Sequence, residues 1–296
     1  MASPPPYVAI DPELLRRLYV DERLTTAEVA ARLGCAGITI LRRLRTFGIP
    51  ARPRGPLRQA KTLRGNIAWS PNLAYAVGLI ATDGNLSGDG RHLSVVSKDR
   101  DLLETLRECL NISTAIRPHG GGHGTAGLRV QWGDRVFYDW LTSIGLTPAK
   151  SLTLRPLAIP DVVFADFLRG CIDGDGSVTV YVDRYHTGKN EHYVYERLYV
   201  TLVSASCAFL DWIQETTLRI LSMRGSIAVK RAEGKSPIWT LRYAKSESIE
   251  LLRRIYYSPT LPCLARKRAT AEPFLRPLGH ASVRGVGRPR AGWVYN

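Results

Sequence analysis

The sequence has no long apolar run, few cysteines and fewer acidic than basic residues. No apolar stretch approaches the ~20 residues that a membrane-spanning helix needs, so we expect no membrane segment. The N-terminus, MASPPPYVAIDPELLRR, lacks the apolar core of a secretion signal. The five cysteines include no CxxC pair, which argues against a disulfide framework and against a zinc site. We therefore expect a cytoplasmic, reducing location.

Acidic residues are scarce: 26 Asp and Glu stand against 41 Lys and Arg, for a net charge of +15. The excess lies at the two ends. Residues 1–70 hold 12 basic and 5 acidic residues, residues 261–296 hold 7 and 1, and the middle is nearly balanced. Basic patches bind polyphosphate because each neutralised phosphate releases counterions. The charge therefore predicts nucleic-acid binding, with a basic protein kept soluble by its charge as the alternative.

Residues 11–50 read as three short helices. The second begins with a capping-box pattern, Thr25 and Glu28, and ends at Gly34. Residues 25–47 resemble a helix-turn-helix, in which the second helix of the pair enters the major groove of DNA. A small helical bundle without a DNA role is the alternative. The apolar residues of the third helix are expected on one face: Ile38, Leu41, Leu44 and Phe47.

Basic residues continue along the third helix and into both flanking segments. Residues 51–67 show no periodicity and are expected to form a basic linker, which either is solvated or lies in a minor groove. The tail, residues 276–296, contains Gly-Arg-Pro-Arg, which looks like the core of an AT-hook. The candidate DNA contacts in these segments are Arg42, Arg43, Arg45, Arg52, Arg54, Arg288 and Arg290.

The middle of the chain is an internal repeat, with copies at residues 68–158 and 159–275. Each copy reads helix–strand–strand–helix–strand–strand–helix. The sequence therefore predicts an α+β fold, a pseudo-twofold pair of αββαββα domains with antiparallel sheets. A small all-α domain over residues 1–50 precedes this pair.

Each copy begins with an apolar helix that ends in Asp-Gly. The first reads YAVGLIATDGNLS from residue 75, and the second reads FLRGCIDGDGSVT from residue 167. Gly78 aligns with Gly170, and Asp83 aligns with Asp175. Small residues four apart let two helix backbones approach closely, so these helices are expected to pack side by side.

Side-by-side packing would bring Asp83 and Asp175 together at two helix C-termini. Gly84 and Gly176 are expected to end the helices as left-handed caps. Carboxylates at this end of a helix meet the negative pole of its dipole, and two together repel each other. A divalent cation relieves both conflicts, and carboxylate oxygens suit Mg²⁺.

These stretches resemble the LAGLIDADG signature of homing endonucleases: residues 76–84 read AVGLIATDG, and residues 168–176 read LRGCIDGDG. The resemblance covers residues 68–272 and includes GLTPAKSLTL at 145–154 and LARKR at 264–268. It implies that the signature helices form the interface between the repeats. It also implies that Asp83 and Asp175 bind the catalytic Mg²⁺, for which Ca²⁺ or Mn²⁺ substitutes. Asp173, at the earlier acidic position, is expected on the surface or at the helix end.

The resemblance implies a monomeric, site-specific double-strand DNA endonuclease (a homing endonuclease or meganuclease) that hydrolyses phosphodiesters of a long asymmetric target across the minor groove. Candidate basic residues at the scissile phosphates are Lys98, Lys150 and Lys267. Ala205 stands where the first repeat has Lys98, which predicts slower cleavage of one strand. The strands are expected to form two saddles over the major grooves, with candidate contacts at Arg91, Arg129, Arg184, Arg197, Lys230, Arg231 and Arg242.

Other functions remain open. One is a transcription regulator on the same fold, like sporulation regulators that carry such a domain beside a helix-turn-helix and tend to lack the acids. Another is an intron maturase that binds RNA. An intein is not expected, because the chain starts at Met1 without a Cys or Ser and ends in Tyr-Asn rather than His-Asn. Cleavage with Mg²⁺ separates the endonuclease from the regulator, and RNA splicing identifies the maturase.

Overall fold

The computed structural model describes residues 10–22, 24–51, 67–120, 126–185, 192, 194–234 and 236–275. The contacts within the chain divide it into two units, residues 1–60 and 61–296. The DNA contacts expected at Arg52, Arg54, Arg288 and Arg290 lie outside the described residues. In the part of the chain that is described, every helix is too short or too polar to cross a membrane.

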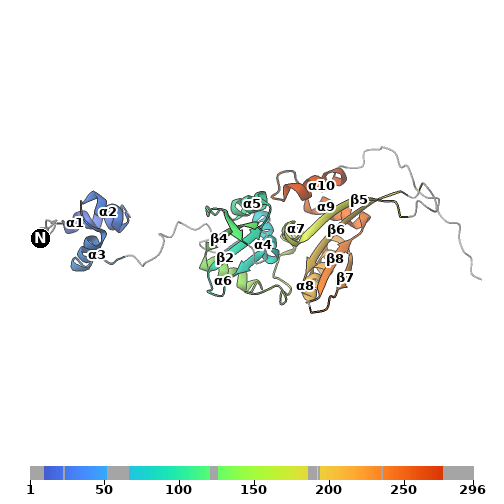
Figure 1. Ribbon diagram of the computed structural model, residues 1–296, viewed down its shortest axis with the longest axis horizontal. Helices are drawn as coiled ribbons and strands as arrows, with labels where there is room; N and C mark the ends of the chain where they lie inside the picture. Colours follow the sequence, from blue (N-terminus) through green and yellow to red (C-terminus); the bar gives the residue numbers. More distant parts are fainter. Residues whose placement is uncertain are drawn as a thin grey trace, which may run out of the picture. The chain divides into compact units, whose positions relative to one another are not determined.

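The first unit contains α1 (Pro12–Arg16), a π-helical turn η1 (Arg17–Asp21), α2 (Thr26–Arg32) and α3 (Gly37–Thr46) (Figure 1). The capping box at the start of α2 is present. The Glu28 amide donates to Thr25 Oγ1 at 3.2 Å, and the Thr25 amide donates to Glu28 Oε2 at 2.7 Å. The unit has its own apolar core, formed by Ile10, Leu15, Leu18, Tyr19, Val29, Ala30, Ile40, Leu44 and Ile49.

The expected apolar face of α3 is partly wrong. Ile40 and Leu44 are fully buried, whereas Ile38 is 57% exposed and Leu41 37% exposed. The sequence places apolar residues on two sides of this helix, and only packing against the rest of the unit determines which side is buried. The exposed surface of α3 therefore combines Ile38 and Leu41 with basic side chains, including the exposed Arg42.

The second unit consists of two αββαββα repeats and confirms the predicted α+β fold class (Figure 1). The first repeat contains α4 (Pro71–Thr82), β1 (Gly84–Leu86), β2 (His92–Ser97), α5 (Arg100–Leu110), β3 (Arg117–Gly120), β4 (Ala126–Gly133) and α6 (Arg135–Ser143). The second contains a 3-10 turn η2 (Asp161–Val163), α7 (Phe164–Asp175), β5 (Gly176–Asp183), β6 (Tyr195–Ser204), α8 (Cys207–Leu221), β7 (Ser226–Lys230), β8 (Ile238–Tyr243) and α9 (Lys245–Ile255), followed by α10 (Ala265–Leu275).

Each repeat builds a four-stranded antiparallel sheet with the same strand order. The orders are β1-β2-β4-β3 and β5-β6-β8-β7. Side chains alternate between the two faces of a strand. On β6, Leu198, Val200 and Leu202 are buried against the helices, so Arg197, Tyr199 and Thr201 lie on the opposite face. Each sheet thus has one face packed against helices and one face, called here the outer face, that these helices leave uncovered.

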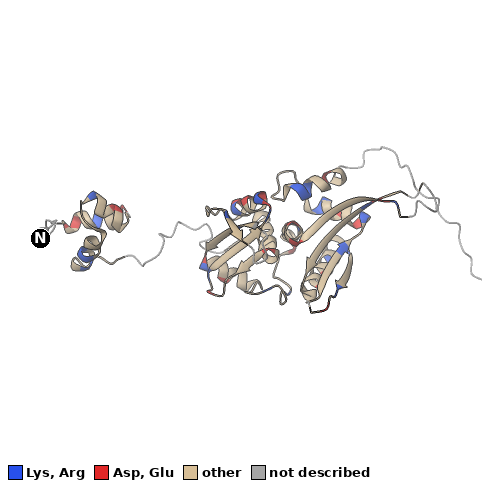
Figure 2. Ribbon diagram, viewed as in Figure 1, with Lys and Arg blue, Asp and Glu red and all other residues tan. Residues whose placement is uncertain are grey.

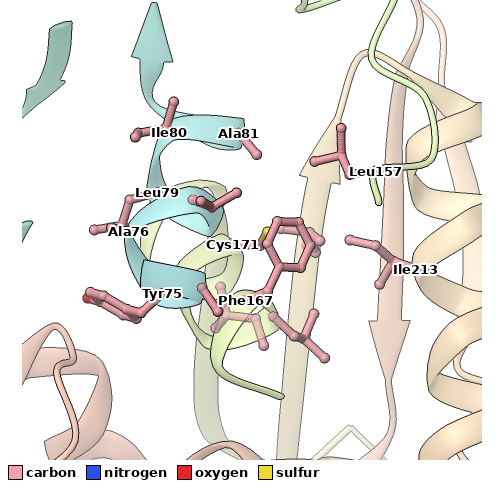
Figure 3. Close-up of a cluster of buried hydrophobic side chains, with 14 of the residues drawn as sticks. Tyr75, Ala76, Leu79, Ile80, Ala81, Leu157, Phe167, Cys171 and Ile213 are labelled. Atoms are coloured by element: carbon pink, nitrogen blue, oxygen red, sulfur yellow. The ribbon is translucent and has the colours of Figure 1, made fainter. Parts of the chain in front are cut away.

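The helices α4 and α7 pack against each other at the centre of the unit. A Cβ on Gly78 would lie 2.2 Å from the Phe167 carbonyl oxygen, and a Cβ on Gly170 would lie 2.2 Å from the Tyr75 carbonyl oxygen. Only glycine allows this approach at both positions. Apolar side chains from α4, α7 and α8 surround the contact, as Figure 3 shows for Leu79, Phe167 and Ile213. The pairing of the two helices expected from their glycines is therefore present.

The glycines that follow the two aspartates are not left-handed caps, contrary to expectation. Gly176 has an extended backbone, with φ −95° and ψ 176°, and Gly84 does not have a positive φ either. Each helix passes directly into the first strand of its repeat, which leaves no room for a side chain. A Cβ on Gly84 would lie 2.5 Å from the Ile80 carbonyl oxygen, and one on Gly176 would lie 2.7 Å from that of Ile172.

Candidate active site and nucleic-acid interface

The two Asp-Gly stretches end beside each other. Asp83 is the C-cap of α4, and Asp175 is the last residue of α7. Gly174 lies against the end of α4, because a Cβ on it would be 3.2 Å from an Asp83 carboxylate oxygen and 2.1 Å from the Thr82 hydroxyl oxygen. The structure therefore brings the ends of the two signature helices together, with one carboxylate at each.

The electrostatics of this pair favour a bound cation. Burial and the negative charge of Asp175 raise the pKa of Asp83 to about 6, although Lys267 and Lys150 act in the opposite direction. Partial burial by neighbouring protein atoms also raises the pKa of Asp175, although its side chain remains in contact with solvent. A hard divalent cation would relieve this conflict. Among the described residues, no group of three or more His, Cys, Asp or Glu side chains is arranged to hold a metal ion. The protein ligands available to a cation at the helix ends are therefore the two carboxylates of Asp83 and Asp175.

Lys150 lies beneath the end of the first signature helix. Its side chain is buried, and Nζ donates to the carbonyl oxygens of Gly84 at 2.5 Å and Thr82 at 3.3 Å. Carbonyl groups in the last turn of a helix lack partners within the helix, so the ammonium group satisfies them and offsets the helix dipole. Burial lowers the pKa of Lys150, while the charges of Asp175 and Asp83 raise it.

Lys267 occupies the corresponding position in the second repeat. Its buried Nζ donates to the carbonyl oxygens of Ile172 and Gly176 at 2.7 Å, Asp173 at 2.8 Å and Gly174 at 3.3 Å. Burial lowers its pKa, and the charges of Asp173, Asp83 and Asp99 raise it. The carbonyl groups at the end of α4 and at the end of α7 are therefore each bound by one buried lysine. Each lysine supports the backbone that carries one of the aspartates.

Lys98 differs from the other two lysine candidates. It follows β2 directly and is exposed to solvent. Its neighbour Asp99 contributes to the raised pKa of Asp83, so this corner lies near the helix ends. The structure does not give Lys98 the contact with helix carbonyls that Lys150 and Lys267 make. Ala205 occupies the same corner of the second repeat, between Ser204 and the N-cap of α8.

The expectation that Asp173 lies at the surface is wrong. The side chain is 1% exposed, and its Oδ2 accepts hydrogen bonds from the Tyr75 hydroxyl at 2.9 Å and the Leu264 amide at 2.7 Å. Asp173 lies on the side of α7 that faces α4 and the segment before α10. The pattern of apolar residues within α7 alone does not show that these distant segments cover this side. Burial raises the pKa of Asp173 to about 6. Its hydrogen bonds join α7 to α4 and to the segment before α10.

The outer face of the first sheet carries facing arginines. Arg129 on β4 pairs in register with Arg117 on β3, so both side chains lie on the same face. Like charges directly opposite each other destabilise a sheet unless an anion lies between them. Arg117 was missed by the sequence analysis, because only the register of the strands places it opposite Arg129. Arg91 precedes β2 and is exposed.

The outer face of the second sheet combines arginines with tyrosines. Arg197 donates from Nε to Asp183 Oδ2 at 3.0 Å and lies over the Tyr195 ring, 5.3 Å from its centroid. Arg242 lies 4.9 Å from the centroid of the Tyr199 ring. The alternation in YERLYV is the sequence signal that places these tyrosines on one face of β6. Figure 2 shows the basic positions, and the remaining candidates lie at strand ends: Arg184 after β5, Lys230 as the last residue of β7, and Arg231 after it.

Comparison with solved structures finds similar folds at low sequence identity. The homing endonuclease I-WcaI bound to its DNA recognition sequence is 11% identical, with a TM-score of 0.48, and the match covers 75% of this chain and 94% of that one. I-DmoI in complex with DNA and Ca is 17% identical, with a TM-score of 0.44, and the match covers 68% and 97%. Full-length DUF199/WhiA from Thermatoga maritima is 13% identical, with a TM-score of 0.43.

The match with WhiA covers 72% of this chain but only 64% of that protein, so this chain spans less than two-thirds of its length. These similarities concern the fold alone. Neither the comparison with protein-family models nor that with curated proteins finds a match.

Proposed function

We propose that this chain is a site-specific, double-strand DNA endonuclease that uses a divalent cation. The observation that carries the proposal is the pair Asp83 and Asp175, one at the end of each of two abutting helices, with a raised pKa at both. Two equivalent carboxylates in two equivalent repeats suit a substrate with two equivalent strands. Duplex DNA is such a substrate, and each carboxylate would serve one strand.

In this proposal the protein places the reacting groups. Asp83 and Asp175 would hold the cation, for which Mg²⁺ is the expected ion and Ca²⁺ or Mn²⁺ a substitute. When bound, the cation would lower the pKa of an attacking water and neutralise charge on the phosphate. Lys150 and Lys267 hold the helix ends, so that the carboxylates keep their positions. Hydrolysis joins the water oxygen to phosphorus and releases the sugar oxygen with a proton.

The outer faces of the two sheets would hold the duplex. Arg117 and Arg129 provide positive charge on the first sheet, and Arg197 and Arg242 provide it on the second. The two faces differ, because the second carries tyrosines such as Tyr181 and Tyr199, whose tilted rings lie 6.2 Å apart between centroids, whereas the described strands of the first sheet contain no tyrosine. A monomer with two different faces fits a long asymmetric target. Light scattering that showed an obligate dimer on a palindromic site would contradict this part of the proposal.

The deciding experiment compares Asp83→Asn and Asp175→Asn with the unchanged chain on a target plasmid. Each variant keeps the shape of the side chain and removes one ligand charge. Both are expected to lose linearisation in Mg²⁺ and to retain the gel shift in Ca²⁺, since the outer faces are unaltered. Asp139→Asn is the matched control, because Asp139 is an exposed residue of α6 paired with Arg135. Normal linearisation by either helix-end variant would remove that carboxylate from the mechanism.

A DNA-binding regulator without cleavage is the second candidate. It is favoured by the N-terminal unit, which has its own core and an exposed surface of α3 that includes Arg42 and Arg45. Hydrolysis itself does not need such a unit. A randomised target library distinguishes the two functions: the regulator would select and bind a sequence but leave both strands intact in Mg²⁺.

A further inference from the structure

The two repeats contain the same corner between their second strand and the helix that follows. In the first, the Asp99 amide donates to the Ser97 hydroxyl oxygen at 3.1 Å. In the second, the Ser206 amide donates to the Ser204 hydroxyl oxygen at 3.1 Å. Asp99 is the N-cap residue of α5, and Ser206 is the N-cap residue of α8. Asp99 and Ser206 are therefore equivalent positions, although their side chains differ.

Asp99 reaches from the first repeat to the segment that carries Lys267. Arg266 donates from Nε to both Asp99 oxygens at 3.1 and 3.2 Å and from Nη2 to Oδ2 at 2.9 Å. Asp101 adds a weaker contact from the same helix, accepting from the Ala265 amide at 3.4 Å. Arg266 immediately precedes Lys267 in α10, so the first repeat holds the start of the helix that supports the end of α7.

Ser206 makes the reciprocal contact. Its buried hydroxyl donates to the Leu154 carbonyl oxygen at 2.5 Å. The Leu154 amide in turn donates to the Lys150 carbonyl oxygen at 2.8 Å. The second repeat therefore holds the turn that begins at Lys150, the lysine that supports the end of α4. Asp99 and Ser206 are not metal ligands, and the function proposed above does not use them.

We propose that Asp99 and Ser206 are positioning residues, each of which fixes from the opposite repeat the lysine beneath one aspartate. Neither half of the site is then placed by its own repeat alone. The two contacts differ in strength. The Asp99–Arg266 pair is largely exposed on the Arg266 side, where such pairs contribute little, whereas the Ser206 hydrogen bond is buried and its loss leaves a buried carbonyl oxygen without that donor.

The first experiment does not depend on cleavage. A lysine-acylating reagent is applied to the folded chain, and modification of Lys98, Lys150 and Lys267 is followed by mass spectrometry. Lys230, an exposed residue at the end of β7 that neighbours neither Asp99 nor Ser206 in the sequence, is followed as well and serves as the internal reference. Asp99→Asn is expected to speed acylation of Lys267 about two- to fivefold and to leave Lys150 unchanged. Ser206→Ala is expected to speed acylation of Lys150 about tenfold and to leave Lys267 unchanged.

Matched controls separate this effect from loss of an ion pair or a helix cap. Asp161→Asn breaks another exposed carboxylate–arginine pair, with Arg219, that touches neither lysine segment. Asp134→Ala removes the N-cap of α6, whereas Ser206→Ala removes the N-cap of α8 together with the contact to Leu154. Both controls should leave the two lysines protected, and Ser206→Thr should restore protection of Lys150. The proposal would be overturned if one variant speeded acylation of Lys150 and Lys267 equally. It would also be overturned if Asp99→Asn left the acylation rate of Lys267 unchanged, or if Ser206→Ala left that of Lys150 unchanged.

The second experiment rests on the proposed endonuclease activity. Each DNA strand carries its own fluorophore, and single-turnover cleavage is measured with saturating enzyme. Asp99→Asn and Ser206→Ala should slow opposite strands, with binding unchanged. If the unchanged chain does not cut, the proposed function fails and the acylation result still decides the positioning. If it cuts and each variant slows both strands equally, the positioning proposal fails alone.

Discussion

At the scale of single residues, Asp173 is a buried carboxyl whose protonation affects stability. Its pKa in the folded chain, about 6, lies above the ordinary value of 3.8. The protonated form therefore stabilises the fold below about pH 4, and this contribution is lost as the pH rises through about 6. Asp173→Asn cannot ionise and keeps an acceptor oxygen for Tyr75 and Leu264. Its stability relative to the unchanged chain should therefore rise between pH 4 and pH 7.

This prediction is checked by denaturant unfolding at both pH values without divalent cations. Asp173→Ala is the comparison, because it leaves the Tyr75 hydroxyl and the Leu264 amide without their acceptor. It should lower the free energy of unfolding by about 2 kcal/mol. If the difference between the Asn variant and the unchanged chain were the same at both pH values, Asp173 would not titrate in this range.

Arg197 and Arg242 should differ in DNA recognition. Arg197 is fixed by Asp183 and Tyr195, whereas Arg242 has only the ring of Tyr199 among the contacts described above. A fixed guanidinium suits bidentate reading of a base, typically a guanine, whereas a less constrained one suits a phosphate. Under the proposed function, Arg197→Lys should relax preference at one base pair, and Arg242→Lys should weaken binding evenly. Binding selections on a randomised target measure both, and equal profiles would contradict the distinction.

At the scale of elements, the contact between α4 and α7 depends on glycine. Alanine at position 78 or 170 would place a carbon 2.2 Å from a backbone oxygen, so the helices would have to move apart. Although alanine raises helix propensity by about 1 kcal/mol, the clash should lower the free energy of unfolding by about 2 kcal/mol or more. Thermal unfolding tests this, with Gly88→Ala as control because open space surrounds Gly88. Unchanged stability of Gly78→Ala would show that the helices are not this close.

At the scale of the whole molecule, the N-terminal segment should contribute affinity rather than chemistry. Its core is separate from that of the repeats, so a chain lacking residues 1–66 should still fold. Residues 1–70 hold 12 basic and 5 acidic residues, so the deletion removes much of the net charge of +15. DNA binding should weaken and depend less on salt, because fewer counterions are released. Gel shifts at several salt concentrations measure this.

Cleavage in Mg²⁺ at high enzyme concentration should survive the same deletion, because Asp83 and Asp175 lie in the second unit. Circular dichroism and thermal unfolding establish that the shortened chain is folded. A folded shortened chain that no longer cuts at any enzyme concentration would show that the N-terminal segment takes part in the reaction.

The sequence by itself determined the repeat, the ends of the two helices at Asp-Gly and the glycines between the helices. These features depend on local spacing and on residue types, such as glycine, that particular conformations require. Because the chain contains two repeats, each feature occurs twice in the sequence. The capping box at Thr25 and Glu28 is of the same kind, since both partners lie within one turn. The fold class followed from these signals.

The tertiary structure alone decided which polar groups are buried and which elements hold them. Asp173 looked like a surface residue because its partners, Tyr75 and Leu264, are 98 and 91 positions away. Lys150 and Lys267 were selected near the site, but their hydrogen bonds to helix carbonyls depend on how each repeat folds back on itself. Burial and long-range hydrogen bonds depend on the packing of whole elements, and that packing has no local signature in the sequence.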